Sequence, residues 1–426
     1  MKEELLHFVW KYQLFEKREL TTTSGETVEI IQQGIHNFDA GPDFLQAKIK
    51  IGQQIWAGNI EIHVQSSEWF NHGHQNNPAY KNVILHLVYE DDMGKNFQNK
   101  TKIPVLSLKY RINRIVIENY HQMMSNTQWI ACEDSIHLVD SLTWQNWLQR
   151  LLTERLEYKL KYIDDLLLKY QNDIHECLFI SIARSFGYRV NADAFEKLAQ
   201  ITPQKIIARH KNSLFQIEAL LFGQAGLLDQ KFTDEYPLKL QREYEFLASK
   251  YNLVSMDSTE WKYARLRPPN FPTIRIAQFA QLLYKSSSLL NKITNIKQVD
   301  EIFRLFNTET SPYWHNHFTF DQITENKARK KTGKNLINRI IINSVIPIIF
   351  YYGKDKNEQE LTQLAFDLFE KIEPEKNSIL DKWTSLGIAN KNSADSQALI
   401  HLKNYYCEQK KCLSCSAGTF ILKKQK

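Results

Sequence analysis

The chain has 426 residues, of which 43% are apolar and 12% aromatic, enough material for two or three packed domains. Charged residues make up 24% and are well mixed, while glycine and proline are scarce, which argues against long disordered segments. The net charge of +6 is uneven, because residues 1–125 hold 13 basic and 14 acidic side chains and the rest holds a basic surplus of seven. This suits a catalytic module beside a module that binds a polyanion, although such a surplus is also ordinary for solubility.

The N-terminus predicts no targeting segment. It reads MKEELLHFVWKYQLF and carries acids where a signal peptide needs bases. The longest apolar run, residues 336–353, contains Arg339 and two asparagines and predicts a buried helix instead of a membrane span. We therefore expect a cytoplasmic protein with no membrane partner, and its oligomeric state stays open.

Apolar residues at helical spacing predict a first amphipathic helix over residues 3–17. Branched and aromatic runs bounded by Gly, Asn, Asp or Pro then predict five strands. These strands span residues 27–34, 44–52, 55–65, 82–90 and 103–109.

After Asn113 the pattern changes to a long period of 3.6 residues, which predicts helices with a break at residues 187–191 and a new helix after Pro272. The fold class is therefore α+β, with an N-terminal mixed sheet and flanking helix followed by a mostly helical domain. We predict domains at 1–125 and 126–400 and a cysteine-containing segment at 401–426.

Two carboxylates in the strand region suggest a metal site. Asp43 follows Pro42, and Glu61 and His63 share one face of the strand 55–65, because side chains alternate with period two. The order helix, strand, Pro-Asp, Glu-x-His strand and further strand resembles the core of the PD-(D/E)XK nuclease superfamily, and this resemblance implies a restriction-endonuclease-like sheet. In such a site two carboxylates hold a divalent cation, Mg²⁺ or Mn²⁺, that activates water and neutralises the scissile phosphate.

His63 replaces the lysine of the superfamily motif. A neutral imidazole can ligate a metal or accept a proton, but it is no permanent ammonium. The resemblance therefore implies Asp43 and Glu61 as metal ligands and His63 as a further ligand or base. Glu3 or Glu4 of the first helix could add an acid, and Glu4 is the supporting acid that we predict. Ordinary strand polarity is the alternative.

Three more histidines lie within 25 residues of Glu61. His72 and His74 flank one glycine and could grip a transition metal or contact phosphate, while His86 sits among apolar strand residues. The alternative is that His86 is a core histidine and the loop pair is solvated. We predict all three as supporting residues.

Cys407, Cys412 and Cys415 form a C-x4-C-x2-C cluster, three thiolates where a tetrahedral site needs four. Cys132 could supply the fourth ligand. One distant cysteine with a C-terminal triplet resembles the iron–sulfur staple of certain helicase-associated and CRISPR-associated nucleases. Zinc, with Cys132 or His401 as fourth ligand, is an equal competitor, and free thiols are the third possibility.

Basic side chains surround the rigid turn RLRPPNFPTIR. Arg265, Arg267 and Arg275 are predicted to bind phosphate there, with a second basic cluster at residues 327–334. Ion pairing of Arg265 and Arg267 with acids of a neighbouring helix is the alternative.

The motifs GPDF, GNIEIHV, HGH, NVILHLVYE, RLRPPNFPTIR and CxxxxCLSC together resemble a bacterial family of about this length that is known only as a domain of unknown function. That resemblance covers the whole chain and implies no reaction. The leading hypothesis is therefore a divalent-metal-dependent phosphodiesterase acting on nucleic acid. The alternatives are a non-catalytic nucleic-acid-binding or scaffolding protein with a degenerate nuclease fold, and a metal-dependent hydrolase of small substrates built on His63, His72 and His74.

Overall fold

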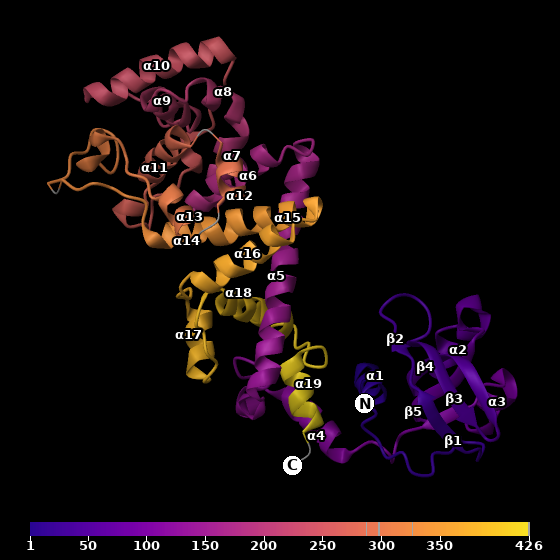
Figure 1. Cartoon of the computed structure of the whole chain (residues 1–426). Coiled ribbons are helices and arrows are strands. Elements are labelled where there is room, and N and C mark those ends of the chain that lie inside the picture. Colours follow the sequence, from indigo (N-terminus) through magenta and orange to yellow (C-terminus); the bar gives the residue numbers. More distant parts are fainter. Residues whose placement is uncertain (287, 297–298, 326, 425–426) are drawn as a thin grey trace. The chain divides into compact units, whose positions relative to one another are not determined.

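The computed structural model describes residues 1–286, 288–296, 299–325 and 327–424, so residues 425–426 of the predicted C-terminal segment lie outside the described residues. The chain divides into two compact units. Unit 1 comprises residues 1–147, 385–387 and 400–426, and unit 2 comprises residues 148–384 and 388–399. The N-terminal mixed sheet and the mostly helical remainder confirm the predicted α+β class (Figure 1).

Unit 1 is built on one six-stranded mixed sheet with the order β1-β3-β4-β5-β6, and β2 pairs with β3 at its edge. The strands are β1 (Val28–Gln32), β2 (Ile35–His36), β3 (Phe44–Ile51), β4 (Gln54–Gln65), β5 (Val83–Glu90) and β6 (Val105–Ser107). All five predicted strands are therefore present, and only the two-residue β2 was missed.

Strand direction changes at β4. A tight turn at Gly52 makes β3 and β4 antiparallel, whereas the connection through α2 (Glu68–Asn71) makes β4 and β5 parallel. The apolar residues Ile60 and Ile62 of β4 and Leu85 and Leu87 of β5 are fully buried.

Helix α1 (Glu3–Lys11) packs against β4 and is shorter than the predicted 3–17. The chain leaves the helix at Tyr12, and Gln13 has a positive φ of 52°, which an α-helix does not allow. Phe15 is still buried, because its ring stacks on Trp10 with 5.7 Å between centroids. The apolar spacing therefore predicted correctly that these residues are buried, but it predicted a helix that is too long.

In chain order, the remaining helices of unit 1 come between the strands, after the last strand and at the C-terminal end. They are η1 (His74–Asn76), η2 (Pro78–Tyr80), α3 (Lys95–Thr101), α4 (Arg114–Ser125), η3 (Glu133–Leu138), the π-helix η8 (Lys403–Cys407) and α19 (Ser416–Lys423). Helix α19 packs against α4 and η3, so the C-terminal segment belongs to the unit that begins the chain.

Unit 2 is helical, and α5 and α18 run through its boundaries with unit 1. Its helices are α5 (Ser141–Lys169), α6 (Ile174–Phe186), α7 (Ala192–Ile201), α8 (Gln204–Arg209), α9 (Leu214–Gln224), α10 (Glu235–Tyr251), η4 (Ser258–Glu260), η5 (Pro268–Asn270), α11 (Pro272–Lys285), α12 (Leu289–Thr294), α13 (Val299–Phe306), η6 (Pro312–His315), α14 (Lys334–Ile340), η7 (Ile341–Val345), α15 (Ile346–Lys356), α16 (Gln359–Lys371), α17 (Ser378–Ser385) and α18 (Ser393–Leu402). The predicted break at 187–191 and the helix after Pro272 are both confirmed.

The continuous stretch Lys334–Lys356 is the one helix of the described residues that is long and apolar enough to cross a membrane. Its apolar window is 72% buried inside the structure, as predicted for a core helix.

Candidate functional site

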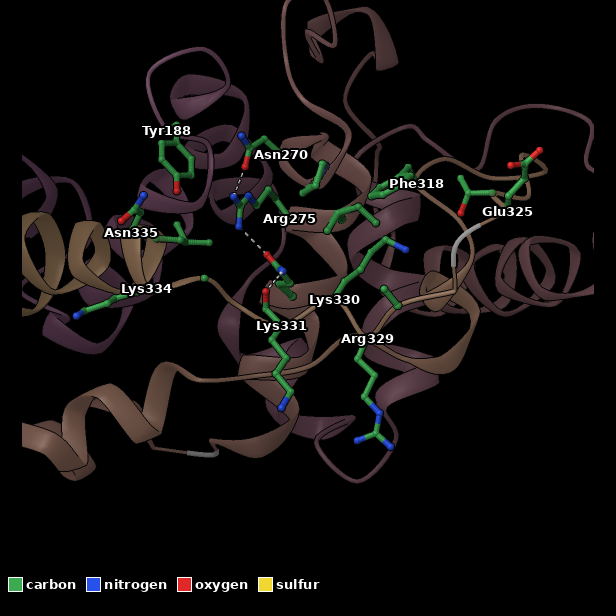
Figure 2. A pocket seen from close by; sticks show the side chains of 17 residues that line it. Tyr188, Asn270, Arg275, Phe318, Glu325, Arg329, Lys330, Lys331, Lys334 and Asn335 are labelled. Carbon is green, nitrogen blue, oxygen red and sulfur yellow. Dashed lines mark hydrogen bonds between the residues drawn. The ribbon is translucent and has the colours of Figure 1, made fainter. Parts of the chain in front are cut away.

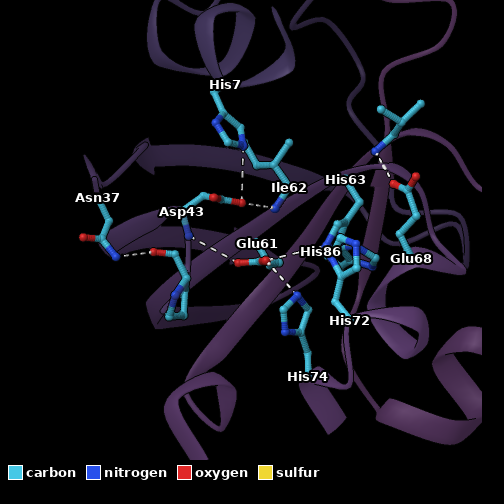
Figure 3. Close-up of polar contacts among 12 residues, drawn as sticks. His7, Asn37, Asp43, Glu61, Ile62, His63, Glu68, His72, His74 and His86 are labelled. Carbon is cyan, nitrogen blue, oxygen red and sulfur yellow. Dashed lines mark hydrogen bonds and ion pairs between the residues drawn. The ribbon is translucent and has the colours of Figure 1, made fainter. Parts of the chain in front are cut away.

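Asp43 and Glu61 lie side by side at one end of the β3–β4 pair (Figure 3). Phe44 pairs with Ile60, which places Asp43, one residue earlier, opposite Glu61. The Asp43 N–H donates to Glu61 Oε2 at 3.2 Å, and the Ile62 N–H donates to Asp43 Oδ2 at 2.8 Å. Each carboxylate is thus held beside the other by the neighbouring strand.

His63 and His86 extend this site along the same face of the sheet. His63 follows Glu61 by two residues on β4, and His86 is the register partner of Glu61 on β5. His63 Nδ1 and His86 Nε2 are 2.8 Å apart and form a buried hydrogen bond. His86 is wholly buried against Trp69 and Phe97, so its ring holds the orientation of His63.

His72 and His74 reach the site from the loop after α2. Glu68 Oε2 accepts hydrogen bonds from the Val64 and Gln65 N–H groups, which fixes α2 to the end of β4. Gly73 between the two histidines has φ 73°, the left-handed conformation that glycine adopts without strain. This conformation lets both imidazoles face His63.

The ligand atoms of His63, His72 and His74 all lie within 4.8 Å of one another. His63 Nε2 is 3.1 Å from His72 Nδ1, and Glu61 Oε1 is 3.2 Å from His74 Nε2 and 3.7 Å from His63 Nε2. Ligands at about 2.0–2.1 Å from a tetrahedral ion are about 3.3–3.4 Å apart. The His63–His72 and Glu61–His74 separations fit neighbouring ligands of this kind, while the set within 4.8 Å contains the three histidines and not Glu61. His74 Nε2 is buried without a hydrogen-bond partner, which also fits a ligand position.

The electrostatics of the site favour a cation. Burial and the neighbouring Asp43 carboxylate raise the pKa of Glu61 to about 9. Burial, with His74 and His72 nearby, lowers the pKa of His63 to about 3, and burial also lowers the pKa values of His74 and His86. Neutral imidazoles offer lone pairs to a metal, and a bound cation can replace the proton of Glu61.

Helix α1 adds His7, which was not predicted from the sequence, and Glu3, one of the two acids that were considered there. His7 Nε2 lies 3.4 Å from Asp43 Oδ2, and Glu3 interacts electrostatically with His7 and Asp43. Glu4, the predicted acid, is exposed and faces Tyr120 instead, because adjacent helical residues point about 100° apart. The i, i+4 spacing of Glu3 and His7 was the signal that could have selected this face.

The cysteines also gather in unit 1. Cys407 lies within electrostatic range of Cys132, Cys412 and Cys415, and Cys132 within range of Cys412 and Cys415. Cys412 and Cys415 are buried, all four thiols are free, and burial raises the pKa of Cys132 and Cys412 to about 12. His401, the alternative zinc ligand, stacks on Tyr405 at 4.5 Å between ring centroids.

Two lysines tie the C-terminal segment to the residues before Cys132. Lys403 Nζ donates to the Trp129 carbonyl at 2.9 Å, and Lys410 Nζ donates to the Met124 and Asn126 carbonyls at 2.7 and 3.0 Å. These bonds bring the cysteine triplet to Cys132 across about 275 positions of sequence.

The three predicted phosphate-binding arginines separate in the structure of unit 2. Arg275 is buried on α11 and lines a cavity, whereas Arg265 and Arg267 are exposed on the preceding loop and do not line it. The loop turns away at Arg265, where φ is 64°. Cys177, the remaining cysteine, is fully buried on α6.

No curated protein and no solved structure matches this chain. A family model does match, over residues 3–378, and this span contains the Asp43, Glu61 and histidine site, Cys132 and Arg275. The chain therefore belongs to the family described as protein of unknown function DUF2851.

Proposed function

We propose that unit 1 is a metal-dependent phosphodiesterase that acts on nucleic acid. The observation that carries this proposal is the convergence of Asp43, Glu61, His63 and His74, with His72 joining from the loop. The antiparallel β3–β4 pair followed by a parallel strand across α2 supports the resemblance to the PD-(D/E)XK nucleases.

The ligand atoms indicate which ion the site takes. Imidazole nitrogens suit zinc and similar transition-metal ions, whereas magnesium and manganese favour oxygen ligands, so the three histidines favour Zn²⁺ over Mg²⁺ here. Mn²⁺ remains a candidate through the Glu61 and Asp43 carboxylates. When bound, the ion supplies a Lewis acid for a phosphate oxygen and lowers the pKa of water. His63, His72 and His74 would hold the ion, and Glu61, 3.2 Å from His74, would complete the ligand set. His86 would fix the tautomer of His63 through its 2.8 Å hydrogen bond.

Asp43 differs from Glu61 in its access to solvent. Its side chain is 20% exposed, against 6% for Glu61, and His7 lies beside it. Asp43 can therefore join the metal or accept a proton from water on the open side of the site. His72 is also exposed, so solvent reaches the site at this histidine as well.

The histidine ligands also support a second candidate, a metal-dependent hydrolase of small phosphodiesters. The test compares cleavage of single- and double-stranded DNA and RNA with cleavage of bis-p-nitrophenyl phosphate, each with Mn²⁺, Zn²⁺ and Mg²⁺. Cleavage of a polymer supports the nuclease, and cleavage of the small diester alone supports the second candidate. Binding of nucleic acid without any cleavage would reject both and favour a scaffolding role.

For the cysteines, the proposal is a structural metal centre held by Cys132, Cys407, Cys412 and Cys415. Among the described residues, the group of three or more ligand atoms within 4.8 Å of one another contains no cysteine, so no three of the four sulfur atoms meet this spacing together. Thiolates around an iron–sulfur cluster bind different irons and need a wider spacing, which favours the cluster over zinc. Free thiols also support a cytoplasmic location, since reducing compartments preserve them.

A further inference from the structure

Unit 2 contains a cavity of about 1020 Å³ between α11, residues 318–325 and 328–331, and the start of α14 (Figure 2). Its size is at the upper end of the range of small-molecule sites, about 300–1,000 Å³. Five basic side chains line it, against the single carboxylate of Glu325. The basic residues are Arg275, Arg329, Lys330, Lys331 and Lys334.

Arg275 is the buried cation of this cavity, with only 6% of its surface exposed. Nη1 donates to Gln278 Oε1 at 2.8 Å, and Nη2 donates to Asn270 Oδ1. Nε is buried and has no hydrogen-bond partner in the part of the chain that the structure describes. Within the described residues, no carboxylate forms an ion pair with this guanidinium, and a buried charge without a partner is costly.

The basic side chains at the rim of the cavity differ in whether they already have an ion-pair or hydrogen-bond partner. Arg329 pairs with Glu309 at 3.5 Å, and Lys334 pairs with Glu373 at 2.5 Å. Lys330 donates to the carbonyls of Trp314 and His315.

Lys331 is exposed on the cavity rim and makes no ion pair within the described part of the chain. Its carbonyl accepts from Gln278 Nε2 at 3.0 Å, which fixes its backbone beside Arg275 (Figure 2). Arg275 and Lys331 are therefore the two cations available to a ligand.

Aromatic rings lie against the cations. The Arg275 guanidinium is 5.2 Å from the centroid of Tyr188, the Arg339 guanidinium is 5.1 Å from the same ring, and Lys330 Nζ is 4.2 Å from the centroid of Phe318. Tyr188 and Phe318 both line the cavity. A ligand that carries an anionic group and a flat apolar group would use both kinds of contact.

We propose that this cavity binds the phosphate group of a nucleotide, either free or within a nucleic-acid strand, through Arg275 and Lys331. A phosphate group accepts hydrogen bonds from the cations that line the cavity, and its charge offsets the excess of basic side chains around the buried Arg275. The cavity is formed by unit 2 alone, so this inference does not depend on the hydrolase proposed for unit 1.

The experiment measures binding to the full chain in metal-free buffer, so that cleavage does not contribute. The probes are a fluorescein-labelled 12-nucleotide single strand, followed by anisotropy, and AMP and inorganic phosphate as competitors. Lys331→Glu should weaken binding at least tenfold, whereas Lys250→Glu, the same charge change on α10 away from the cavity, should change it less than twofold. Arg275→Gln should weaken binding as Lys331→Glu does.

Removal of one phosphate contact by Lys331→Ala should also lower the slope of log affinity against log salt by about 0.7 for a single strand. If AMP competes with the labelled strand, the cavity binds a free nucleotide. If AMP does not compete, the cavity binds a nucleic-acid strand. The proposal is overturned if no probe binds, or if Lys331→Glu and Lys250→Glu weaken binding equally. Because Lys331 is exposed, its variants decide the matter even if Arg275→Gln fails to fold.

Discussion

Glu61 Oε1 lies 3.2 Å from Nε2 of His74, although the two residues come from a central strand and from a surface loop. The nitrogen has no hydrogen-bond partner and both side chains are largely buried. His63 Nε2 also lies 3.7 Å from the Glu61 carboxylate. Burial lowers the pKa of His74 and so favours its neutral form. This arrangement therefore fits a set of metal ligands better than an ion pair.

Glu61→Gln is expected to lower Mn²⁺ affinity at least 100-fold and to abolish cleavage, because the amide keeps the shape of the side chain and loses its charge. The protein should remain folded, since a neutral side chain already suits this buried position. Isothermal titration with Mn²⁺ and thermal unfolding measure the two effects. Glu90→Gln, a half-exposed acid on β5, is the matched control. Unchanged Mn²⁺ affinity in Glu61→Gln would remove Glu61 from the ligand set.

His86→Leu tests a positioning residue. Loss of its 2.8 Å hydrogen bond to His63 Nδ1 should reduce metal affinity about 10- to 100-fold, although every proposed ligand remains. His86→Gln keeps a polar atom near the position of Nε2 and should recover most of the affinity. Equal affinities in the Leu and Gln variants would show that His86 contributes packing alone.

Gly73→Ala should lower the free energy of unfolding of unit 1 by about 1 kcal/mol, because a β-carbon is disfavoured at φ 73°. Open space around Gly73 means that this cost comes from the backbone and not from a clash. If the loop relaxes, His72 and His74 leave His63 and Mn²⁺ affinity falls as well. Gln75→Ala, an exposed change in the same loop, should leave both quantities unchanged.

Substitution of Cys415 by serine tests the cysteine centre. Wild-type protein purified without oxygen should carry iron and sulfide and absorb visible light, and Cys415→Ser should lose both signals. The variant should also make the residues around Cys132 and α19 more accessible to hydrogen exchange, because the centre joins distant parts of unit 1. Cys177→Ser, a buried thiol of unit 2, is the control. Stoichiometric zinc without iron would show that the centre is a zinc site and not an iron–sulfur cluster. The absence of any metal would show that the four cysteines are free thiols.

The sheet residues of the site were predictable because strand geometry is local. Pro42-Asp43 before one strand and Glu61 and His63 on one face of the next are brought together by a single hairpin. His86 needed only the parallel register of β4 and β5. For Asp43, Glu61 and His63 the period-two alternation and the turn residues were sufficient, whereas for His86 the sequence left a core histidine as the alternative.

The contribution of α1 could not be obtained in the same way. Which helix face covers the sheet depends on packing, and the choice between Glu3 and Glu4 changed with a rotation of about 100°. Arg275 shows the same limit in unit 2, since its separation from Arg265 and Arg267 depends on where a loop turns. Pairing of β2 with β3 was also invisible, because two residues carry no periodicity.

Glu218 of unit 2 should make stability depend on pH. It is fully buried on α9, where Ser311 donates to it at 3.0 Å and Tyr236 also donates to it. Burial raises the pKa of Glu218 from 4.5 to about 7. Between these values the unfolded chain releases the proton and the folded protein keeps it.

The contribution of Glu218 to the free energy of unfolding should therefore be highest below pH 4.5. It should decrease by up to about 3 kcal/mol as the pH rises to 7. Glu218→Gln removes the titrating proton and should abolish this decrease, whereas Glu245→Gln, an exposed change on α10, should retain it. Hydrogen exchange of the α9 amides between pH 4.5 and 8, corrected for intrinsic rates, measures the effect. A wild-type profile that coincides with that of Glu218→Gln would show that Glu218 is ionised in the folded protein throughout this range.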